Sequence, residues 1–340
     1  MDLVAETAAK NTATHLGVML SISPGTMHFF PISIVGPTAV GKSDVALALA
    51  ERVGGEIISV DSMQVYRGMV IGTAKPTAEQ QRRIRHHLID IVGVSESFDA
   101  ARFVVLARAA VCEIQGRGKV PIFCGGSGLY FKAYSDGLGV APPSNPQLRA
   151  QLEGLPLAQL LEELKMRDPV TFEKIDRCNL RRVVRALEVI RLTGNPFSAQ
   201  RAAWPSGEST PSPWFAVGLR RAPEDLKARI NRRVEQMFAD GLVGETRLLL
   251  EQGLAENRTA MQALGYRQAV EHLLGKRALD ETIDLVKIRT RQFAKRQLTW
   301  FRRQMALEWM DANLSPEILA QQIIDKYRNG LGQEEKLASR

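Results

Sequence analysis

Residues 28–53 read HFFPISIVGPTAVGKSDVALALAERV, an apolar run followed by a glycine-bounded loop and a helical pattern. The first part is rich in β-forming residues, and the last part has the apolar spacing of an amphipathic helix. The loop between them, GPTAVGKS, matches G-x-x-x-x-G-K-[ST], in which backbone N–H groups surround a phosphate and the lysine neutralises its charge. Because strand, loop and helix occur in the order that this loop requires, the stretch predicts a phosphate site on an α/β sheet.

All eight residues of the loop are therefore candidates for phosphate binding. They are Gly36, Pro37, Thr38, Ala39, Val40, Gly41, Lys42 and Ser43. The hydroxyl group of Ser43 is also the candidate ligand for Mg²⁺, as in other loops of this pattern.

Two further apolar runs predict buried parallel strands. They are EIISVD at residues 56–61 and KVPIFCGGSG at residues 119–128, with a crossing helix over residues 100–115. Ligands of such sheets gather at the carboxyl ends of the strands, so we expect Asp61 and residues 125–127 to face the loop. The predicted fold class is α/β, with a P-loop NTPase-like parallel sheet flanked by helices and interrupted by a helical insertion.

The chain divides by its patterns into five parts. Residues 1–27 form a leader that we expect to be disordered or to precede the true start, and residues 28–140 form the first part of the core. Residues 141–205 are arginine-rich and helical, which indicates the insertion. Residues 206–315 hold a further strand, WFAVGL, and basic helices of the core, and residues 316–340 predict a helix with a polar tail. In the insertion, Val183, Leu187 and Ile190 share a helical face that should point to a core.

Composition favours an anionic partner without identifying it. Forty-five Lys and Arg against 37 Asp and Glu give a formal charge of +8 over 340 residues, which suits nucleic acid and is equally consistent with a basic soluble enzyme. Three widely spaced cysteines indicate reduced thiols, and no zinc site or disulfide framework. The apolar stretch over residues 16–35 is broken by Pro24, Gly25 and Pro31, so we expect neither export nor a membrane span, and a cytoplasmic protein.

The phosphate loop alone leaves several functions open. A small-molecule kinase that uses ATP on this loop is one, and in it Asp61 would be a magnesium ligand. No base-reading motif of a GTPase follows. A basic RNA-binding module with a degenerate loop is another, but it predicts loss of Lys42 or Ser43, and both are intact.

The remaining motifs resemble those of the tRNA dimethylallyltransferases. They are GPTAVGKS, SVDSMQVYRGMVIGTAKP at residues 59–76, HHLID at 86–90, GGSGLYFKA at 125–133, LRRVVRALEV at 180–189 and TRQFAKRQLTWFRR at 290–303. The resemblance implies transfer of a dimethylallyl group from dimethylallyl diphosphate to N6 of adenosine 37, in tRNAs that read codons beginning with U. It also implies a diphosphate in the loop, Mg²⁺ as cofactor and the tRNA anticodon stem-loop as partner. A monomer is the default, since one chain holds the whole predicted site.

Three residues receive catalytic roles through this resemblance. Asp61 would accept a proton from the adenine amine, which is a weak nucleophile and needs a base. The hydroxyl group of Thr38 would reach the bridging oxygen of the leaving diphosphate. In LKARINRRVEQMF, the family's R-I-x-x-R-[FV] pattern selects Arg233 as the diphosphate contact rather than Arg229 or Arg232, although helical arginines are ordinarily solvated surface charges.

The resemblance also implies a set of tRNA contacts. A flipped adenine would be bordered by Asp61, Ser62, Met63 and Gln64. The mouth of its channel would be formed by Ser127 and Arg149. Phosphates would meet Arg181, Arg182 and Arg185, and the anticodon loop would be approached by Gly265, Tyr266 and Arg267. Arg181 replaces the glutamine usual in the family. A row of Arg289, Arg296 and Arg303 beside Phe293 and Trp300 suits RNA, but inward packing of the two aromatic residues is the favoured interpretation.

Overall fold

The computed structural model describes residues 30–200 and 214–338. The leader over residues 1–27 and the proline-rich segment over residues 201–213 lie outside the described residues. No helix among the described residues is both long enough and apolar enough to cross a membrane.

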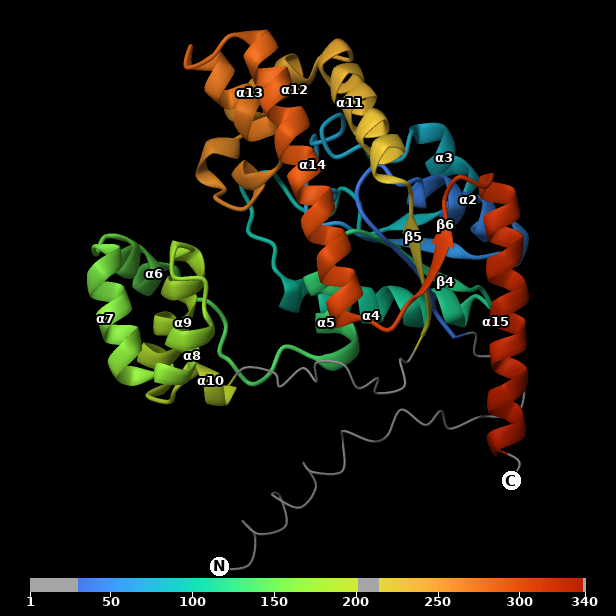
Figure 1. The fold of residues 1–340 in the computed structure, drawn as a ribbon, viewed down its shortest axis with the longest axis horizontal. Coiled ribbons are helices and arrows are strands. Elements are labelled where there is room, and N and C mark those ends of the chain that lie inside the picture. Colours follow the sequence, from blue (N-terminus) through green and yellow to red (C-terminus); the bar gives the residue numbers. More distant parts are fainter. Residues whose placement is uncertain (1–29, 201–213, 339–340) are drawn as a thin grey trace, which may run out of the picture.

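The described residues form a six-stranded sheet in which every pair of neighbouring strands is parallel (Figure 1). The strand order is β3-β2-β4-β1-β5-β6. The strands are β1 (Ile32–Val35), β2 (Glu56–Val60), β3 (His86–His87), β4 (Pro121–Gly125), β5 (Phe215–Arg220) and β6 (Glu308–Asp311). This confirms the predicted fold class, and β1, β2, β4 and β5 lie where the sequence placed strands. The edge strands β3 and β6 were not predicted.

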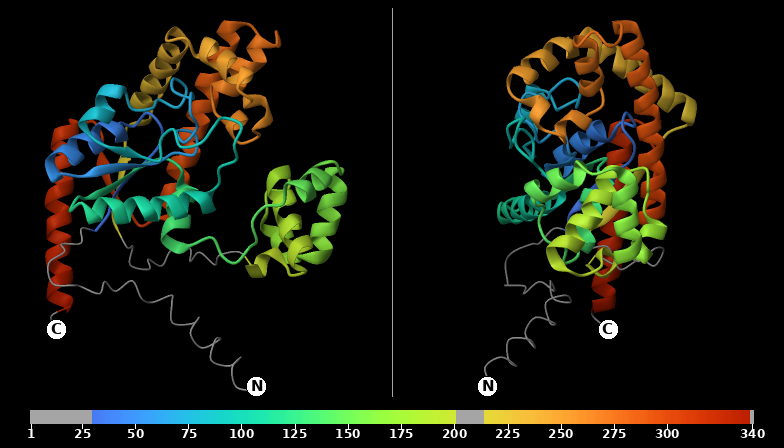
Figure 2. Two further views of the ribbon diagram at one scale, coloured as in Figure 1. Left: turned by 180° about the vertical axis from the view of Figure 1, so that it is seen from behind. Right: turned by 90° about the vertical axis from the view of Figure 1, so that its left-hand side faces the viewer.

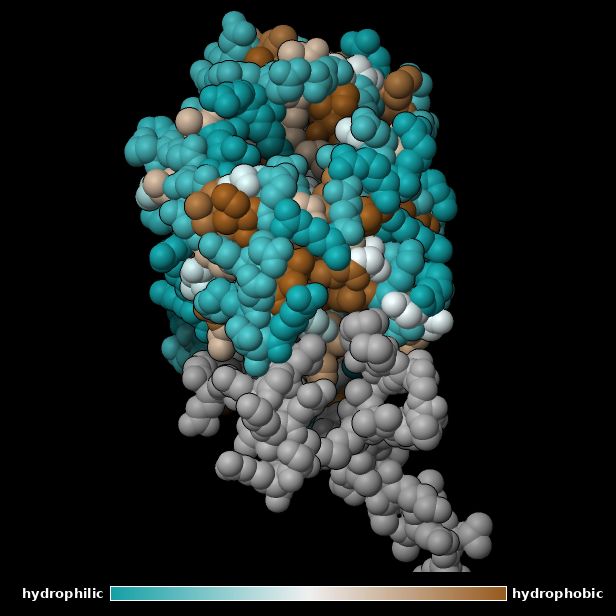
Figure 3. Space-filling view, turned by 90° about the vertical axis from the view of Figure 1, so that its right-hand side faces the viewer, coloured by the Kyte–Doolittle hydropathy of each residue, from teal (hydrophilic) through white to brown (hydrophobic). Residues whose placement is uncertain are grey.

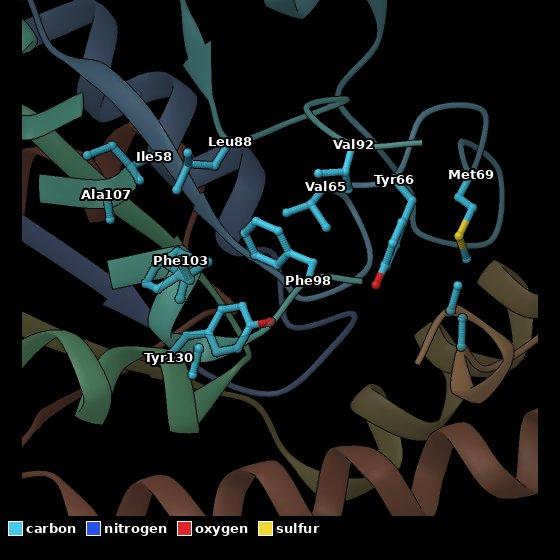
Figure 4. Packing of buried hydrophobic residues seen from close by; sticks show 14 of the residues in the cluster. Ile58, Val65, Tyr66, Met69, Leu88, Val92, Phe98, Phe103, Ala107 and Tyr130 are labelled. Atoms are coloured by element: carbon cyan, nitrogen blue, oxygen red, sulfur yellow. The ribbon is translucent and has the colours of Figure 1, made fainter. Parts of the chain in front are cut away.

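Helices cover both faces of the sheet. Helix α2 (Lys42–Val53) and helix α15 (Pro316–Ala338) pack on one face, where Leu49 and Ile323 are fully buried with Ile34. Helix α4 (Ala100–Gly116) and helix α5 (Gly128–Asp136) cover the other face, and Figure 4 shows Phe103 and Tyr130 in that core. The predicted crossing helix over residues 100–115 is therefore present as α4.

The arginine-rich segment folds into five short helices with a core of their own. They are α6 (Pro146–Glu153), α7 (Leu157–Arg167), α8 (Pro169–Lys174), α9 (Leu180–Thr193) and α10 (Phe197–Gln200). Val183, Leu187 and Ile190 of α9 are buried, as their spacing predicted. Figures 1 and 2 show this group of helices standing beside the sheet rather than on either of its faces.

A third group of helices lies above the carboxyl ends of the strands (Figure 1). It contains α11 (Pro223–Ala239), α12 (Leu242–Glu251), η1 (Leu254–Glu256), η2 (Ala260–Gln262), α13 (Tyr266–Leu273) and α14 (Leu279–Gln304), with α3 (Ala78–Arg83) near the sheet edge. The 26 residues of α14 span about 39 Å at 1.5 Å per residue. This length lets one helix contact α11 and α13 near its start and α5 near its end.

The face that carries α2 and α15 shows no large apolar area in the part that Figure 3 draws in colour. Figure 3 shows hydrophobic side chains there in small patches separated by hydrophilic ones. That surface therefore has the mixed character of an ordinary exposed face.

Candidate active site

Three neighbouring strands end at the same level beneath the third group of helices. Gly125 of β4 pairs with Val35 of β1 on one side and with Val60 of β2 on the other. The phosphate loop after β1, Asp61 after β2 and the turn over residues 126–127 after β4 therefore meet at one edge, as the sequence predicted. Parallel pairing requires this convergence, because it brings every carboxyl end to the same side.

The phosphate loop has backbone angles that favour glycine near both of its ends. Gly36 has φ of 151°, and a Cβ there would lie 2.7 Å from the carbonyl oxygen of Leu219. Gly41 has φ of 109° and caps the start of α2. Ala39 adopts φ of 64°, an uncommon value for a residue with a side chain. The loop therefore wraps closely over the sheet instead of extending away from it.

Two arginines hold this loop by hydrogen bonds to its backbone. Nε of Arg229 donates to the carbonyl oxygen of Ala39 at 3.0 Å, and Nε of Arg221 donates to that of Val40 at 2.9 Å. Arg229, one of the three arginines considered in the sequence, thus contacts the loop itself.

Two half-buried cations beside the loop lack an anionic partner among the described residues. Nζ of Lys42 donates only to the carbonyl oxygen of Pro37, at 2.7 Å, and the guanidinium group of Arg233 makes no ion pair. The pKa of Lys42 is lowered from 10.5 to about 8, mainly by burial and in part by the positive charge of Arg233, while Cys124 and Asp61 oppose the shift. Burial also lowers the pKa of Arg233. A bound anion would relieve both groups, so the site is built for one.

One cavity of about 650 Å³ brings the predicted catalytic residues together. Thr38, Asp61 and Arg233 all line it, together with Ser62, Met63 and Ser127. Its other walls come from Gly72, Thr73 and the helices α11, α13 and α14, which contribute Arg267, Arg277, Arg289, Arg296 and Phe293. A volume of this size suits a substrate rather than a single ion.

The carboxylate of Asp61 has a fixed orientation in this cavity. Its Oδ1 accepts a hydrogen bond from the backbone N–H of Met63 at 2.8 Å. The next residue, Ser62, donates its backbone N–H to Oγ of Ser127 at 3.1 Å. The segment after β2 is thereby tied to the turn after β4, and Oδ2 of Asp61 stays available to a ligand.

Comparison with known proteins decides the family of the chain. Residues 64–304 match the IPP transferase family. The chain belongs to this family. It is 45% identical to a tRNA dimethylallyltransferase of Geobacter metallireducens over 82% of this chain and 92% of the relative, and 45% identical to one of Geobacillus kaustophilus over 82% and 89%. The predicted family is therefore confirmed, and the chain is a transferase.

Solved structures of IPP transferases have the same fold. The full-length tRNA isopentenylpyrophosphate transferase of Bacillus halodurans is 38% identical, with a TM-score of 0.68 over 92% of this chain and 100% of its own. A eukaryotic dimethylallyltransferase, captured while acting on tRNA, is 28% identical, with a TM-score of 0.67 over 83% of this chain and 73% of its own. The P-loop NTPase-like core is thus shared across bacterial and eukaryotic members.

Two residues that were expected to meet tRNA are instead internal to this IPP transferase. Oε1 of Gln64 accepts from Oγ of Ser59 at 2.7 Å, and its Nε2 donates to the carbonyl oxygen of Thr73 at 3.1 Å. Gln64 therefore holds the protein backbone and does not line the cavity. The side chain of Tyr266 is fully buried, so a contact of this residue with the anticodon loop, which stays a prediction, would have to come from its backbone.

Two arginines of the helical insertion are also committed internally. Arg149 donates from Nε and Nη2 to both carboxylate oxygens of the fully buried Glu188, at 2.9 and 3.0 Å. Arg185 donates to Glu188 at 2.6 Å and to the carbonyl oxygen of Pro142 at 2.7 Å. Although burial alone would raise it, these bonds lower the pKa of Glu188. The charge of Arg185 therefore compensates a buried carboxylate, and its contact with tRNA phosphates stays a prediction.

Other predicted contacts remain accessible. Arg181 and Arg182 are exposed on α9. Arg267 lines the cavity and is half of an ion pair with Glu271. Gly265 precedes it with φ of 92°, and donates its N–H to Oε1 of Gln268 at 3.0 Å, so this glycine is required by the backbone at the start of α13.

The aromatic row on α14 divides into two roles. Trp300 packs against the larger core and lies over Gly128, as the favoured interpretation predicted. Phe293 is 37% exposed and lines the cavity, with the guanidinium group of Arg296 5.9 Å from its ring centroid. Phe293 thus presents a flat apolar surface to a ligand rather than to the core.

The residues beside the loop fit a magnesium ion that is shared with a phosphate ligand. The Ser43 side chain is exposed at the start of α2 and has no hydrogen-bond partner among the described residues. Those residues hold no group of three His, Cys, Asp or Glu side chains that could bind a metal by themselves. Magnesium commonly takes one or two protein ligands and completes its shell with phosphate oxygens and water. Ser43 would supply the protein ligand of such a site.

Sequence reasoning missed two residues that organise the cavity. Gln297 of α14 bonds to the phosphate loop and to the turn after β4. Glu245 of α12 accepts hydrogen bonds from the backbone N–H groups of Val70 and Ile71, at 3.2 and 3.1 Å. Neither residue stands in a pattern that signals a buried polar role, because both contacts join parts of the chain more than 170 residues apart.

Proposed function

We propose that this IPP transferase transfers a dimethylallyl group from dimethylallyl diphosphate to N6 of adenosine 37, in tRNAs that read codons beginning with U. The products are N6-dimethylallyladenosine and diphosphate. Membership of the family and the names of its relatives support the reaction class. The carboxylate of Asp61 in the cavity supports an amine as the acceptor atom, and the choice of adenosine 37 is what the family resemblance implies.

The observation that carries the proposal is that one cavity is lined by two chemically distinct sets of groups. Thr38 of the phosphate loop and Arg233, whose positive charge acts on that of Lys42, suit a diphosphate. The carboxylate of Asp61 lines the same space. So do Phe293 and several arginines, which suit a base and its phosphates. We propose that a diphosphate ester and a nucleotide enter this cavity from opposite sides and meet at Asp61.

The groups in the cavity account for every bond, electron pair and proton of the transfer. A bond forms between N6 of the adenine and C1 of the dimethylallyl group while the bond between C1 and the diphosphate oxygen breaks. The electron pair of that bond leaves with the diphosphate, whose charge is stabilised by Lys42, Arg233 and a hydrogen bond from the Thr38 hydroxyl group. Asp61 accepts the proton that N6 loses, because the amine becomes acidic as the new bond forms.

Magnesium would be held by the Ser43 hydroxyl group and by diphosphate oxygens. When bound, it neutralises charge that develops on the leaving group. The backbone N–H groups of the loop, apart from that of Thr38, which donates to Gln297, and the ammonium group of Lys42 would bind and orient the same diphosphate.

The exposed basic residues suit the tRNA backbone. Arg181 and Arg182 of the insertion and Arg289 and Arg296 of α14 make no ion pair within the described residues. Because all groups used by the reaction come from one chain, we propose that a single copy carries it out in the cytoplasm, where its tRNA substrates are found.

The test is label transfer by the purified protein with Mg²⁺ and an unmodified anticodon stem-loop. One arm contains radiolabelled dimethylallyl diphosphate, and the other contains ATP labelled at the γ-phosphate. Label should pass from the diphosphate to RNA, and replacement of adenosine 37 by guanosine should abolish it. Hydrolysis of ATP, or passage of its phosphate to a small acceptor with RNA unlabelled, would contradict the proposal and favour a kinase.

A further inference from the structure

We propose that Gln297 of α14 is a positioning residue, which fixes Thr38 of the phosphate loop relative to Asp61. The inference rests on the proposed function, because it assigns to Gln297 the geometry in which the leaving group and the base meet. Gln297 touches neither reacting atom in that scheme. It acts through the backbone of Thr38 and through the turn after β4.

The side-chain amide of Gln297 joins two of the three strand ends. Its Oε1 accepts the backbone N–H of Thr38 at 2.9 Å, and its Nε2 donates to the carbonyl oxygen of Gly126 at 2.9 Å. The residue is only 7% exposed. Both polar ends of this buried amide are thus satisfied by backbone groups. Loss of the amide would leave the N–H of Thr38 without this partner, whereas the carbonyl oxygen of Gly126 would keep its hydrogen bond from the N–H of Gly128, at 3.1 Å.

Two glycines let α14 approach the turn closely enough for this bridge. A Cβ at Gly126 would lie 2.2 Å from Nε2 of Gln297, and a Cβ at Gly128 would lie 2.2 Å from Cε3 of Trp300. Gln297 and Trp300 are three residues apart and share a face of α14. The helix therefore rests on the turn at two points, and it cannot slide along the turn without a clash at one of them.

The bridge continues to Asp61 through Ser127. The backbone N–H of Ser127 donates to the carbonyl oxygen of Val60 at 3.2 Å, and its Oγ accepts the N–H of Ser62 at 3.1 Å. Hydrogen bonds and short covalent links thus connect Thr38 to Asp61 by way of Gln297. Of these links, the amide of Gln297 is the one that crosses from the phosphate loop to the turn.

This arrangement assigns different tasks to the two polar groups of Thr38. Its backbone N–H is occupied by Gln297, so it is not a phosphate donor. Its hydroxyl group has no partner among the described residues and lines the cavity. Fixing the backbone fixes the direction of that hydroxyl group, and misplacement of a reacting group by about 1 Å can cost about 10²-fold in rate.

The test is a double-mutant cycle on Gln297→Met and Thr38→Ala, read as the rate of prenyl transfer at saturating tRNA and dimethylallyl diphosphate. Methionine keeps the length of the side chain and removes both hydrogen bonds. We expect the single variant Gln297→Met to lose about 10- to 100-fold in kcat, with KM for tRNA within about twofold of wild type. In the Thr38→Ala background the same change should cost less than about threefold, because its effect passes through Thr38.

Gln200→Met is the matched control for loss of a buried amide. Gln200 has the same exposed fraction, 7%, and its Nε2 donates to Oγ1 of Thr193 at 2.6 Å in the helical insertion. It should lower the melting temperature without lowering kcat. If Gln297→Met does not yield folded protein, the cycle is run with Gln297→Glu, which keeps the acceptor for Thr38 and loses the donor to Gly126 when ionised.

Additive losses in the cycle, or an unchanged kcat in Gln297→Met, would overturn the inference while wild-type protein still labels RNA. If the wild-type chain itself does not label RNA, the proposed function fails and the inference fails with it. The two failures are therefore distinguished by the wild-type lane of the same assay.

Discussion

The hydroxyl group of Tyr266 donates a hydrogen bond to Oε1 of Glu245 at 2.5 Å and accepts one from the backbone N–H of Gly72 at 3.1 Å. The carboxylate of Glu245 also accepts the N–H groups of Val70 and Ile71. Through this pair, α12 and α13 hold the segment that carries Gly72 and Thr73 into the cavity wall. Tyr266 therefore shapes the site from a fully buried position, although the sequence suggested a direct RNA contact.

Tyr266→Phe should reveal this role. The change leaves the N–H of Gly72 without its partner and removes one of the hydrogen bonds that Oε1 of Glu245 accepts, so the free energy of unfolding should fall by about 1–3 kcal/mol in urea denaturation. Prenyl transfer should also slow, because the cavity wall loosens. Tyr327→Phe is the matched control, since that hydroxyl group donates to the carbonyl oxygen of Phe30 far from the cavity. Equal losses of activity in both variants would argue against a local effect at Tyr266.

Asp61→Ala should separate catalysis from binding. Prenyl transfer should fall by about 10²- to 10⁴-fold, the usual contribution of a positioned base, while affinity for tRNA survives. Single-turnover transfer and filter binding on the same preparation measure the two quantities. A parallel loss of tRNA affinity would show that Asp61 anchors RNA or supports the fold, and is not the base.

The far end of the sheet provides a pH prediction. Glu56 at the start of β2 is buried and accepts hydrogen bonds from Arg117 at 2.7 Å and from His87 at 2.7 Å. Although burial opposes the shift, these bonds lower the pKa of Glu56 from 4.5 to about 2. The carboxylate therefore stabilises the fold above pH 4.5, by roughly 3 kcal/mol, and this contribution is lost as the pH falls toward 2.

Urea denaturation of wild type and Glu56→Gln at several pH values measures this contribution. The difference in unfolding free energy should be largest near pH 7 and should shrink below pH 4.5. A difference that stays constant down to pH 2.5 would mean that the ion cluster around Glu56 does not lower the carboxylate pKa in the folded state.

The close contact between α5 and α14 predicts opposite effects of two glycine substitutions. Gly128→Ala places a Cβ 2.2 Å from the ring of Trp300 and should destabilise the fold by about 1–3 kcal/mol. Gly116→Ala, in α4, meets nothing within 4 Å and should be neutral or stabilise by up to about 1 kcal/mol. Thermal unfolding of both variants gives the comparison, and a neutral Gly128→Ala would show that α14 can move away from the turn.

The two kinds of arginine on α9 should behave differently. Arg182→Gln removes an exposed charge, so tRNA affinity should fall and the salt dependence of binding should decrease by about one unit in slope. Arg185→Gln leaves the buried Glu188 with one partner fewer and should instead lower the melting temperature. Identical salt slopes for wild type and Arg182→Gln would remove Arg182 from the RNA interface.

The sequence predicted the parts of this molecule that local patterns encode. The strand, loop and helix around Lys42 and the convergence of Asp61 with residues 125–127 follow from apolar periodicity and from the geometry of parallel sheets. The edge strand β3 was not predicted, because it consists of only two residues, His86 and His87, and both are polar. Strand β6, with the sequence EWMD, alternates too briefly to be distinguished from a loop.

The site was predicted less completely than the fold, because burial and partners decide what a side chain does. Arg182 and Arg185 look alike in sequence, yet only Arg185 faces the buried Glu188. Gln297 appears as one more polar residue in a basic helix, and its role depends on contact with Thr38, 259 residues earlier. Such long-range pairings leave no local periodicity from which they could be inferred.

The most direct test of the account is the identity of the nucleoside that the enzyme makes. An unmodified anticodon stem-loop would be incubated with the protein, Mg²⁺ and dimethylallyl diphosphate, then digested to nucleosides and analysed by mass spectrometry. The account predicts one adenosine per stem-loop heavier by one dimethylallyl group, with the added mass on the base fragment and lost when adenosine 37 is replaced. Unmodified adenosine throughout, or added mass on the ribose or on another nucleotide, would contradict it.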